Sequence, residues 1–341
     1  MKKILTIITT AYNEEKNIER YVETLLNQKS KNFKVIFVND GSTDNTLNKI
    51  NEYSVKLREK GIDILILDIE NQGLSKARNI AIDEVIKLKG SEYISFVDCD
   101  DTLKEEYISK IENAVQNNTE NEKVDILKWN LEIQDGNQQT KEINKSIENV
   151  ENISGIELFE KLAFNDPLFV MPSLYAIRLE YMEKNNFKFM IGKYHEDYEL
   201  IPKIIINASK VKSIDIPLYN YILTEGSITR TTDTNKTIKK AEDTLEIYIK
   251  SKEYGMNNIK NKKDRDIFIQ FYTVGLLEKG KEIYKKANDL NDDKLKEYSK
   301  EYLKKLNSEK LYKNIKYPYF NIKTLIKKFI IKYRIEKYLS R

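Results

Sequence analysis

YISFVDCDD, residues 93–101, places three carboxylates within four positions directly after an apolar run. The run at 93–97 has the composition of a buried strand, whereas Asp98, Asp100 and Asp101 repel one another at its end. Hard divalent cations prefer carboxylate oxygens and keep coordination positions open for phosphate. We therefore predict that Asp98 and Asp100 hold Mn²⁺ or Mg²⁺, which carries a phosphate-bearing substrate.

This loop also has a purely structural interpretation. Asp101 or Thr102 could cap a helix that starts near Lys104, with no metal involved. Cys99, between the two aspartates, suits packing better than nucleophilic catalysis because it is small and follows a buried strand.

The strand at 93–97 belongs to a regular alternation along the first hundred residues. Apolar runs alternate with segments whose apolar side chains recur at helical spacing. Strands are predicted at 4–9, 33–38, 62–67 and 93–97, and helices at 14–28, from a cap at Asp44 to about Lys60, and from a cap at Ser75 to about Leu88. Strands that are apolar throughout and alternate with helices indicate a parallel sheet covered on both faces.

Polar residues gather where these strands end. Tyr12 offers an aromatic face to a base, and the Asp40 carboxylate can accept hydrogen bonds from a base or ribose. Gly73 permits close approach, while Lys76 and Arg78 can meet phosphates or a base carbonyl. The structural alternatives are a partly buried tyrosine, a tight turn and a solvated helix face. Because ligands bind at the carboxyl ends of the strands in open sheets, this edge is the predicted ligand site.

Together the four loops resemble one family. TAYNEE (10–15), VNDGSTDNT (38–46), NQGLSKARN (71–79) and FVDCDD (96–101) occur in the order typical of inverting family 2 glycosyltransferases with the GT-A fold. The resemblance covers about residues 1–230. Over this range the sequence is similar to bacterial capsule, lipopolysaccharide and teichoic-acid enzymes that use nucleotide-sugar donors. The Q-x-x-R-W motif and membrane spans of the processive synthases do not occur, which implies a non-processive enzyme.

The resemblance implies a role for each matching residue. The donor, expected to be a UDP-sugar, would contact Ala11, Tyr12, Glu14, Asp40, Lys76, Arg78, Asp98, Cys99, Ser227 and Arg230. Of these, Tyr12 and Asp40 would hold the base, and Asp98 would face both ribose and metal. Asp100 would ligate the metal that bridges the diphosphate. Ser227 and Arg230 would close over the diphosphate.

The same resemblance points to an acceptor side at Glu196-Asp197. An acceptor hydroxyl must lose a proton as it attacks the anomeric carbon, so one general base is required. We assign the base role to Asp197 and a supporting role to Glu196. The alternative is that this pair only caps the helix that follows. His195, the only histidine, is either an acceptor contact or an ordinary surface residue.

The predicted organisation is a GT-A domain at 1–230 followed by a helical region at 231–341. Within the former, 1–122 would bind the nucleotide and 123–230 would face a glycan or lipid-linked acceptor. The chain carries a net charge of +4, yet 301–341 hold 12 Lys/Arg and 3 Asp/Glu, so the first 300 residues are net acidic. That distribution argues against a nucleic-acid-binding face on the main body.

The basic tail has three interpretations. Residues 322–341 combine apolar side chains at helical spacing with seven Lys/Arg and one Glu. Such a segment suits a peripheral site on the inner face of the cell membrane, packing on the protein's own helical region, or a homodimer contact. A cytoplasmic setting fits the single cysteine, and the short apolar run near the start suits a strand better than a signal peptide.

Two other functions would use a similar sheet or the same residues. A sugar nucleotidyltransferase also uses a nucleotide-binding sheet, but usually opens with a glycine- and arginine-rich phosphate loop that TAYNEE lacks. A non-catalytic nucleotide-binding module would have no chemical reason to keep Asp98, Asp100 and Asp197 together.

Overall fold

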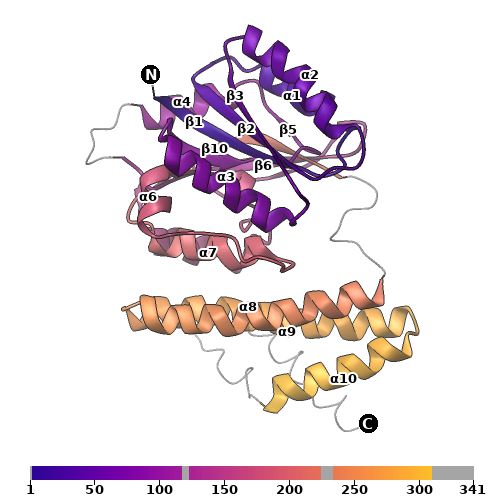
Figure 1. Ribbon diagram of the computed structural model, residues 1–341. Helices are drawn as coiled ribbons and strands as arrows, with labels where there is room; N and C mark the ends of the chain where they lie inside the picture. Colours follow the sequence, from indigo (N-terminus) through magenta and orange to yellow (C-terminus); the bar gives the residue numbers. More distant parts are fainter. Residues whose placement is uncertain (1, 117–122, 224–232, 309–341) are drawn as a thin grey trace. The chain divides into compact units, whose positions relative to one another are not determined.

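The computed structural model describes residues 2–116, 123–223 and 233–308 (Figure 1). The chain divides into two compact units. The first comprises 1–192 and 196–225, and the second comprises 193–195 and 226–341.

The first unit is built on a ten-stranded mixed sheet. Its strand order is β3-β2-β1-β4-β9-β6-β10-β5, with β7 paired to β6 and β8 to β10. The four predicted strands are confirmed as the parallel set β1 (Lys3–Ala11), β2 (Phe33–Asp40), β3 (Asp63–Ile69) and β4 (Ser91–Phe96). Their carboxyl ends therefore meet at one edge.

Helices cover both faces of this sheet (Figure 1). α1 (Ile18–Leu26) and α2 (Thr46–Glu59) contact each other on one face, and α3 (Leu74–Leu88) packs on β1 and β2 from the other. α1 buries Ile18, Tyr21, Val22 and Leu25, which is the apolar stripe that the sequence pattern predicts.

Two predicted helix starts are wrong, and backbone hydrogen bonds explain why. The first helix starts at Ile18 and not at residue 14, because the amides of Glu14 and Glu15 donate to side chains of the 41–46 loop. The third helix starts at Leu74, so Ser75 lies inside it; Gly73 precedes the helix with φ +86°, a conformation that favours glycine. Asp44 does serve the start of α2, since its Oδ1 accepts the amide of Thr46 at 3.0 Å.

The helix-capping interpretation of Asp101 and Thr102 is also wrong. Thr102–Leu103 form the short strand β5, which pairs antiparallel with β10 (Val211–Ile222). The next helix, α4 (Tyr107–Val115), begins four residues later.

The second half of the sheet carries the segments that were expected to face the acceptor. β6 (Ile126–Gln134) forms a hairpin with β7 (Thr140–Asn144). Trp129 of β6 is fully buried and meets Tyr107 of α4 edge to face, with ring centroids 5.1 Å apart. The remaining elements are β8 (Val150–Ile153), α5 (Gly155–Leu162), η2 (Pro172–Leu174), β9 (Tyr175–Arg178), α6 (Leu179–Lys184) and α7 (Glu196–Asn207).

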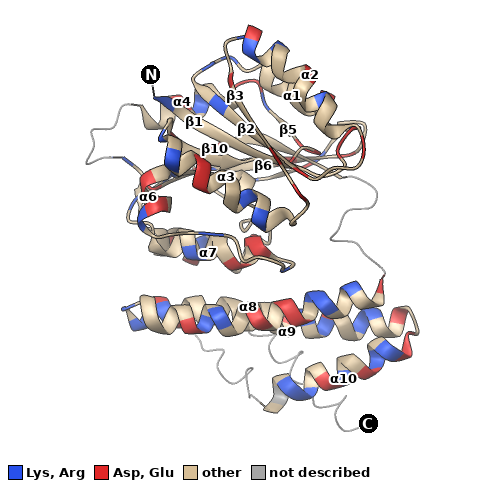
Figure 2. Ribbon diagram, in the orientation of Figure 1, with Lys and Arg blue, Asp and Glu red and all other residues tan. Residues whose placement is uncertain are grey.

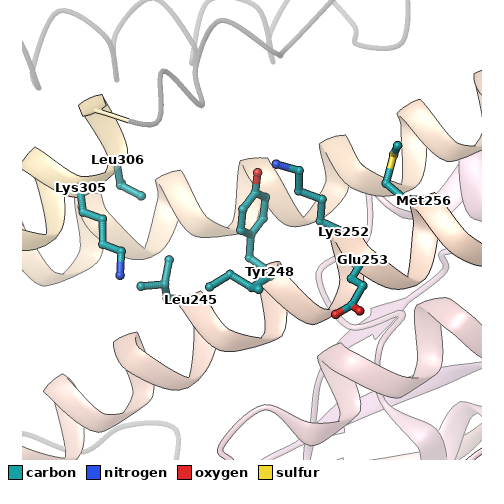
Figure 3. A pocket seen from close by; sticks show the side chains of 8 residues that line it. Leu245, Tyr248, Lys252, Glu253, Met256, Lys305 and Leu306 are labelled. Carbon is teal, nitrogen blue, oxygen red and sulfur yellow. The ribbon is translucent and has the colours of Figure 1, made fainter.

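The second unit is helical, as predicted for its described part. α8 (Thr234–Asn258) packs along α9 (Lys262–Asp289), and α10 (Asp293–Ser308) packs on α9. Leu245, Tyr248 and Met256 of α8 and Leu306 of α10 line a shallow groove (Figure 3). Among the described helices, none is long and apolar enough to span a bilayer.

Candidate active site

The loops after β1 and β2 hold each other through hydrogen bonds. Asn13, with φ +57°, accepts the amide of Thr43 at its Oδ1, at 2.8 Å. The Glu14 amide donates to Thr46 Oγ1 at 2.7 Å. Tyr12 directly precedes these anchors and is 49% exposed, whereas Ala11, the last residue of β1, is buried. A free aromatic face on a fixed loop is a suitable platform for a base.

Asp40 ties the second loop to the third. Its buried carboxylate accepts the amides of Gln72 and Gly73, at 2.8 and 2.9 Å. The loops approach so closely at Gly41 that a Cβ there would lie 2.5 Å from the Asn71 amide nitrogen. Asp40 is therefore a structural acceptor, and any contact with a base remains a prediction.

The carboxylates of Asp98, Asp100 and Glu14 repel one another near the end of β4. Burial and the charges of Asp98 and Glu14 raise the pKa of Asp100 to about 6. Burial also raises the pKa of Glu14, with Asp98 adding to the shift. The Asp100 carbonyl is fixed by Arg20, whose Nη2 donates to it at 2.6 Å.

This electrostatic pattern fits a divalent cation. Asp98 and Asp100 supply hard oxygen ligands, and a cation would relieve the repulsion that disfavours the Asp100 carboxylate. Among the described residues no three His, Cys, Asp or Glu side chains are grouped as a protein-only metal cage. Two aspartates would leave positions open for a diphosphate. Cys99 is buried between them, and its thiol donates to the Thr10 carbonyl at 3.6 Å, in agreement with a packing role.

Asp101, the last aspartate of the motif, holds the loop onto β10. Its buried carboxylate accepts the Ile222 amide at 2.7 Å and the hydroxyl of Tyr219. The third carboxylate of DCDD is thus a structural acceptor, and burial together with the charges of Asp100 and Asp98 raises its pKa.

Arg78 joins the donor edge to the Glu-Asp pair. Its guanidinium is 5% exposed and bonds Asp98 Oδ1 at 2.7 Å through Nη2 and Glu196 Oε1 at 2.9 Å through Nη1. The ring of Phe189 stacks under the same group, 5.2 Å from its central carbon. The arginine that was expected to meet the donor therefore already neutralises two carboxylates.

Asn79 is a residue that sequence reasoning missed. Its side-chain amide donates to the Phe189 carbonyl and accepts the Phe189 amide, both at 2.8 Å. This pair of hydrogen bonds fixes the segment before α7 against α3. The position of Asn79 beside Arg78 in NQGLSKARN could have drawn attention to it, but nothing in the sequence identified Phe189 as its hydrogen-bond partner.

Glu196 and Asp197 form the first turn of α7. Burial and the neighbouring Glu196 raise the pKa of Asp197 to about 7, while Arg78 opposes the shift. A carboxylate with that pKa can accept a proton near neutral pH. The two acidic residues also interact favourably with the helix dipole at the start of α7, as the structural interpretation of this pair requires.

The other predicted residues are placed as follows. Lys76 is half-buried in the first turn of α3. His195 belongs to the second unit, where burial lowers its pKa to about 4, so it is not an ordinary surface histidine. Ser227, Arg230 and the tail at 322–341 lie outside the residues that the structure describes.

Four parallel strands end at one edge, where a D-x-D motif follows β4, and Arg78 links that motif to the Glu-Asp pair. This arrangement is that of a glycosyltransferase of the GT-A class. The comparisons agree: the glycosyl transferase family 2 model matches residues 6–195, and the chain belongs to this family.

The relatives are bacterial glycosyltransferases. The chain is 27% identical to Streptococcus pneumoniae GlyA over 66% of its own length but 31% of that protein. It is 28% identical to S. pneumoniae GlyG over 73% of its length and 80% of the relative. Among solved structures, Staphylococcus aureus TarS 1–349 in complex with UDP-GlcNAc shares the fold at TM-score 0.67, with 19% identity over 93% of this chain and 82% of TarS.

Proposed function

We propose that this protein is a metal-dependent, non-processive, inverting glycosyltransferase. It would move a sugar from a UDP-sugar to a surface-polysaccharide or lipid-linked acceptor. The observation that carries the proposal is the Arg78 network, because one buried guanidinium joins Asp98 at the donor edge to Glu196 beside the candidate base.

The donor side rests on three elements. Tyr12 offers its exposed ring to the base, and Asp98 and Asp100 would hold Mn²⁺ or Mg²⁺ against the diphosphate. A bound cation supplies charge neutralisation for the leaving nucleoside diphosphate. The complex of TarS with UDP-GlcNAc supports a UDP-sugar as the donor class.

The acceptor side needs one base and no acid. Asp197 would accept the hydroxyl proton as the acceptor oxygen attacks the anomeric carbon from the face opposite the diphosphate, which inverts the configuration. Glu196, held by Arg78, would orient the start of α7 so that the Asp197 carboxylate faces the hydroxyl. A glycosidase differs because its leaving group requires a protonated carboxylic acid.

A thermal-shift screen tests the donor assignment. UDP, GDP, CDP and dTDP are each added with and without Mn²⁺, and a ligand that binds only the folded state raises the melting temperature. We expect the largest shift for UDP with Mn²⁺. Slow release of UDP from a UDP-sugar without acceptor would then separate the enzyme from a binding module, and release of pyrophosphate from UTP and a sugar phosphate would instead indicate a nucleotidyltransferase.

A further inference from the structure

Polar side chains are buried at the carboxyl ends of β6 and β10, within the first unit. Glu132 and Gln134 of β6 and Asn220 of β10 are 7%, 6% and 8% exposed. Asn220 lies opposite Glu132 in one ladder and opposite Thr102 of β5 in the other, and Glu132 and Gln134 are two positions apart, so all four side chains share one face. With two further contacts they form what we call the β6–β10 cluster: Thr102, Lys104, Glu132, Gln134, Thr140 and Asn220.

Glu132 is the centre of this cluster. Its carboxylate accepts Lys104 Nζ at 2.7 Å, Gln134 Nε2 at 3.1 Å and the hydroxyl of Thr140. Although burial acts in the opposite direction, these hydrogen bonds lower the pKa of Glu132 to about 2, so its charge cancels that of Lys104. Thr140 is exposed and the Lys104 side chain is 31% exposed, which means that the cluster reaches the surface.

Across the described residues, two carbonyl oxygens of the cluster find no hydrogen-bond partner. They are the buried Oε1 of Gln134 and Oδ1 of Asn220. The Glu132 carboxylate can only accept, so it holds Gln134 by the amide nitrogen and leaves Oε1 open. Asn220 likewise uses its Nδ2 on Thr102 Oγ1, at 3.0 Å. Because a buried carbonyl without a donor is unfavourable, both oxygens are candidate contacts for a ligand.

An amide earlier in β6 shows the contrast. The Nδ2 of Asn130 donates to the Ile147 carbonyl at 3.0 Å and to Asp215 at 2.8 Å. Its Oδ1 accepts the amides of Ser146 and Ile147, at 3.1 and 3.2 Å. Asn130 is therefore a saturated structural amide, whereas the amides at the end of the same row each keep an acceptor open.

The open end of the row adjoins the candidate donor site. β9 runs antiparallel to both β4 and β6, so the carboxyl ends of β4 and β6 point to the same edge of the sheet. Thr102 lies two residues after Asp100, so their Cα atoms are within about 8 Å. A group that contacts Asn220 is consequently close to the aspartates that would hold the metal and the diphosphate.

We propose that the open carbonyls of Gln134 and Asn220 bind hydroxyl groups of an uncharged sugar. A carbonyl oxygen accepts O–H or N–H groups and has nothing to offer a carboxylate or phosphate oxygen. The Lys104–Glu132 pair has no net charge, and Figure 2 shows acidic residues in the loops at this edge, near β5. A uronic acid or a phosphate on the sugar would therefore be rejected here. This inference rests on the proposed function and narrows the sugar that it handles to a neutral one.

Calorimetry on the full chain tests the site in two arms. The donor arm compares UDP with UDP-glucose, UDP-galactose, UDP-N-acetylglucosamine and UDP-glucuronate, all with Mn²⁺. The acceptor arm titrates methyl β-D-glucoside with and without UDP and Mn²⁺. We expect a neutral sugar to add affinity in one of the arms, which identifies its source, and UDP-glucuronate to bind no better than UDP.

Two variants each remove one open carbonyl. Gln134→Met and Asn220→Leu should weaken the contribution of the sugar about two- to tenfold, the range for one hydrogen bond, while the affinity for UDP stays that of the wild type. Gln134 ends β6, so Gln134→Met alone decides the test if Asn220→Leu does not fold. Gln139→Met is the matched control, since Gln139 is exposed in the following turn, where its backbone bonds Asp135. It should bind every ligand as the wild type does.

The outcomes separate this inference from the proposed function. Equal affinities for UDP-glucuronate and the neutral UDP-sugars would overturn the selection for an uncharged sugar. Binding of no neutral sugar in either arm, or unchanged sugar binding in Gln134→Met, would overturn the site and leave the two carbonyls to bound water. Failure to bind UDP would instead refute the proposed function, and the methyl glucoside arm without nucleotide would still report on the cluster.

Discussion

Arg78 Nη1 lies 2.9 Å from Glu196 Oε1, although 118 positions separate the two residues in the chain. The same guanidinium reaches Asp98 through its other terminal nitrogen. A planar, permanently charged fork can satisfy two carboxylates at once, which an ammonium cannot do with the same geometry. The donor edge and the start of α7 are thereby fixed to each other.

The first prediction concerns this arginine. Arg78→Met leaves two partly buried carboxylates without their shared cation, so we expect the free energy of unfolding to fall by about 3–5 kcal/mol. Arg78→Lys should lose less stability yet still reduce turnover, because one ammonium meets one carboxylate well. Urea unfolding measures the first effect, and Lys76→Met, which touches neither ion pair, is the control. Wild-type stability of Arg78→Met would refute the bridging role.

Asp100→Asn should separate stability from function. The raised pKa of Asp100, about 6, means that the folded protein without metal disfavours the carboxylate. The group therefore lowers stability as pH rises from about 4 to about 6, and the loss persists above that range. The asparagine variant should be more stable than the wild type at pH 8 without metal, by roughly 1–3 kcal/mol, yet lose Mn²⁺-dependent UDP affinity. Unchanged calorimetric binding of UDP with Mn²⁺ would exclude the metal role.

Asp197→Asn tests the base. We expect turnover to fall by about 10²–10⁴-fold while UDP affinity stays near that of the wild type. Because Asp197 must be deprotonated to act, and its pKa is raised to about 7, the wild-type turnover should rise with pH through that value. Single-turnover assays from pH 5.5 to 8.5 measure this limb. A variant that loses UDP affinity but keeps turnover would contradict the assignment.

His195 should titrate far below an ordinary histidine. Burial, with Lys279 and Lys240, lowers its pKa to about 4, so the folded chain keeps the ring neutral. The unfolded chain takes up a proton near pH 6.5, and this residue's contribution to stability is therefore lost as pH falls from about 6.5 to 4, by about 1.4 kcal/mol per unit. NMR of the single imidazole gives the pKa directly. His195→Asn, which tolerates a positive φ, should remove this part of the pH dependence.

The tail gives the last prediction. If residues 322–341 place the enzyme on a membrane, the full chain should sediment with anionic vesicles at low salt and be released at high salt, because apolar burial and basic charge both contribute. A protein that ends at Tyr317 should stay in solution. Equal sedimentation of the two proteins would leave packing within the protein, or dimer contact, as the role of the tail.

Local pattern was sufficient for the parallel half of the sheet. Apolar runs at 4–9, 33–38 and 93–97 could only become buried strands, because helices between them must cover both faces. The edge that carries the candidate site could also be predicted, since ligands collect where parallel strands end and DCDD follows one of them. Element starts were less predictable because the amides of Glu14 and Glu15 donate to side-chain acceptors 32 and 29 positions away in sequence.

Tertiary structure alone decided which charges meet. Asp98, Asp100 and Asp101 look equivalent in sequence, yet Asp101 is taken by the Ile222 amide and Tyr219, and Asp98 by Arg78. The alternation of Lys128, Asn130, Glu132 and Gln134 along β6 suggests a solvent face, but all four side chains are buried. A sequence shows periodicity and residue chemistry, whereas burial and pairing depend on segments that lie from 20 to more than a hundred residues apart, so only the folded chain assigns a partner to each carboxylate.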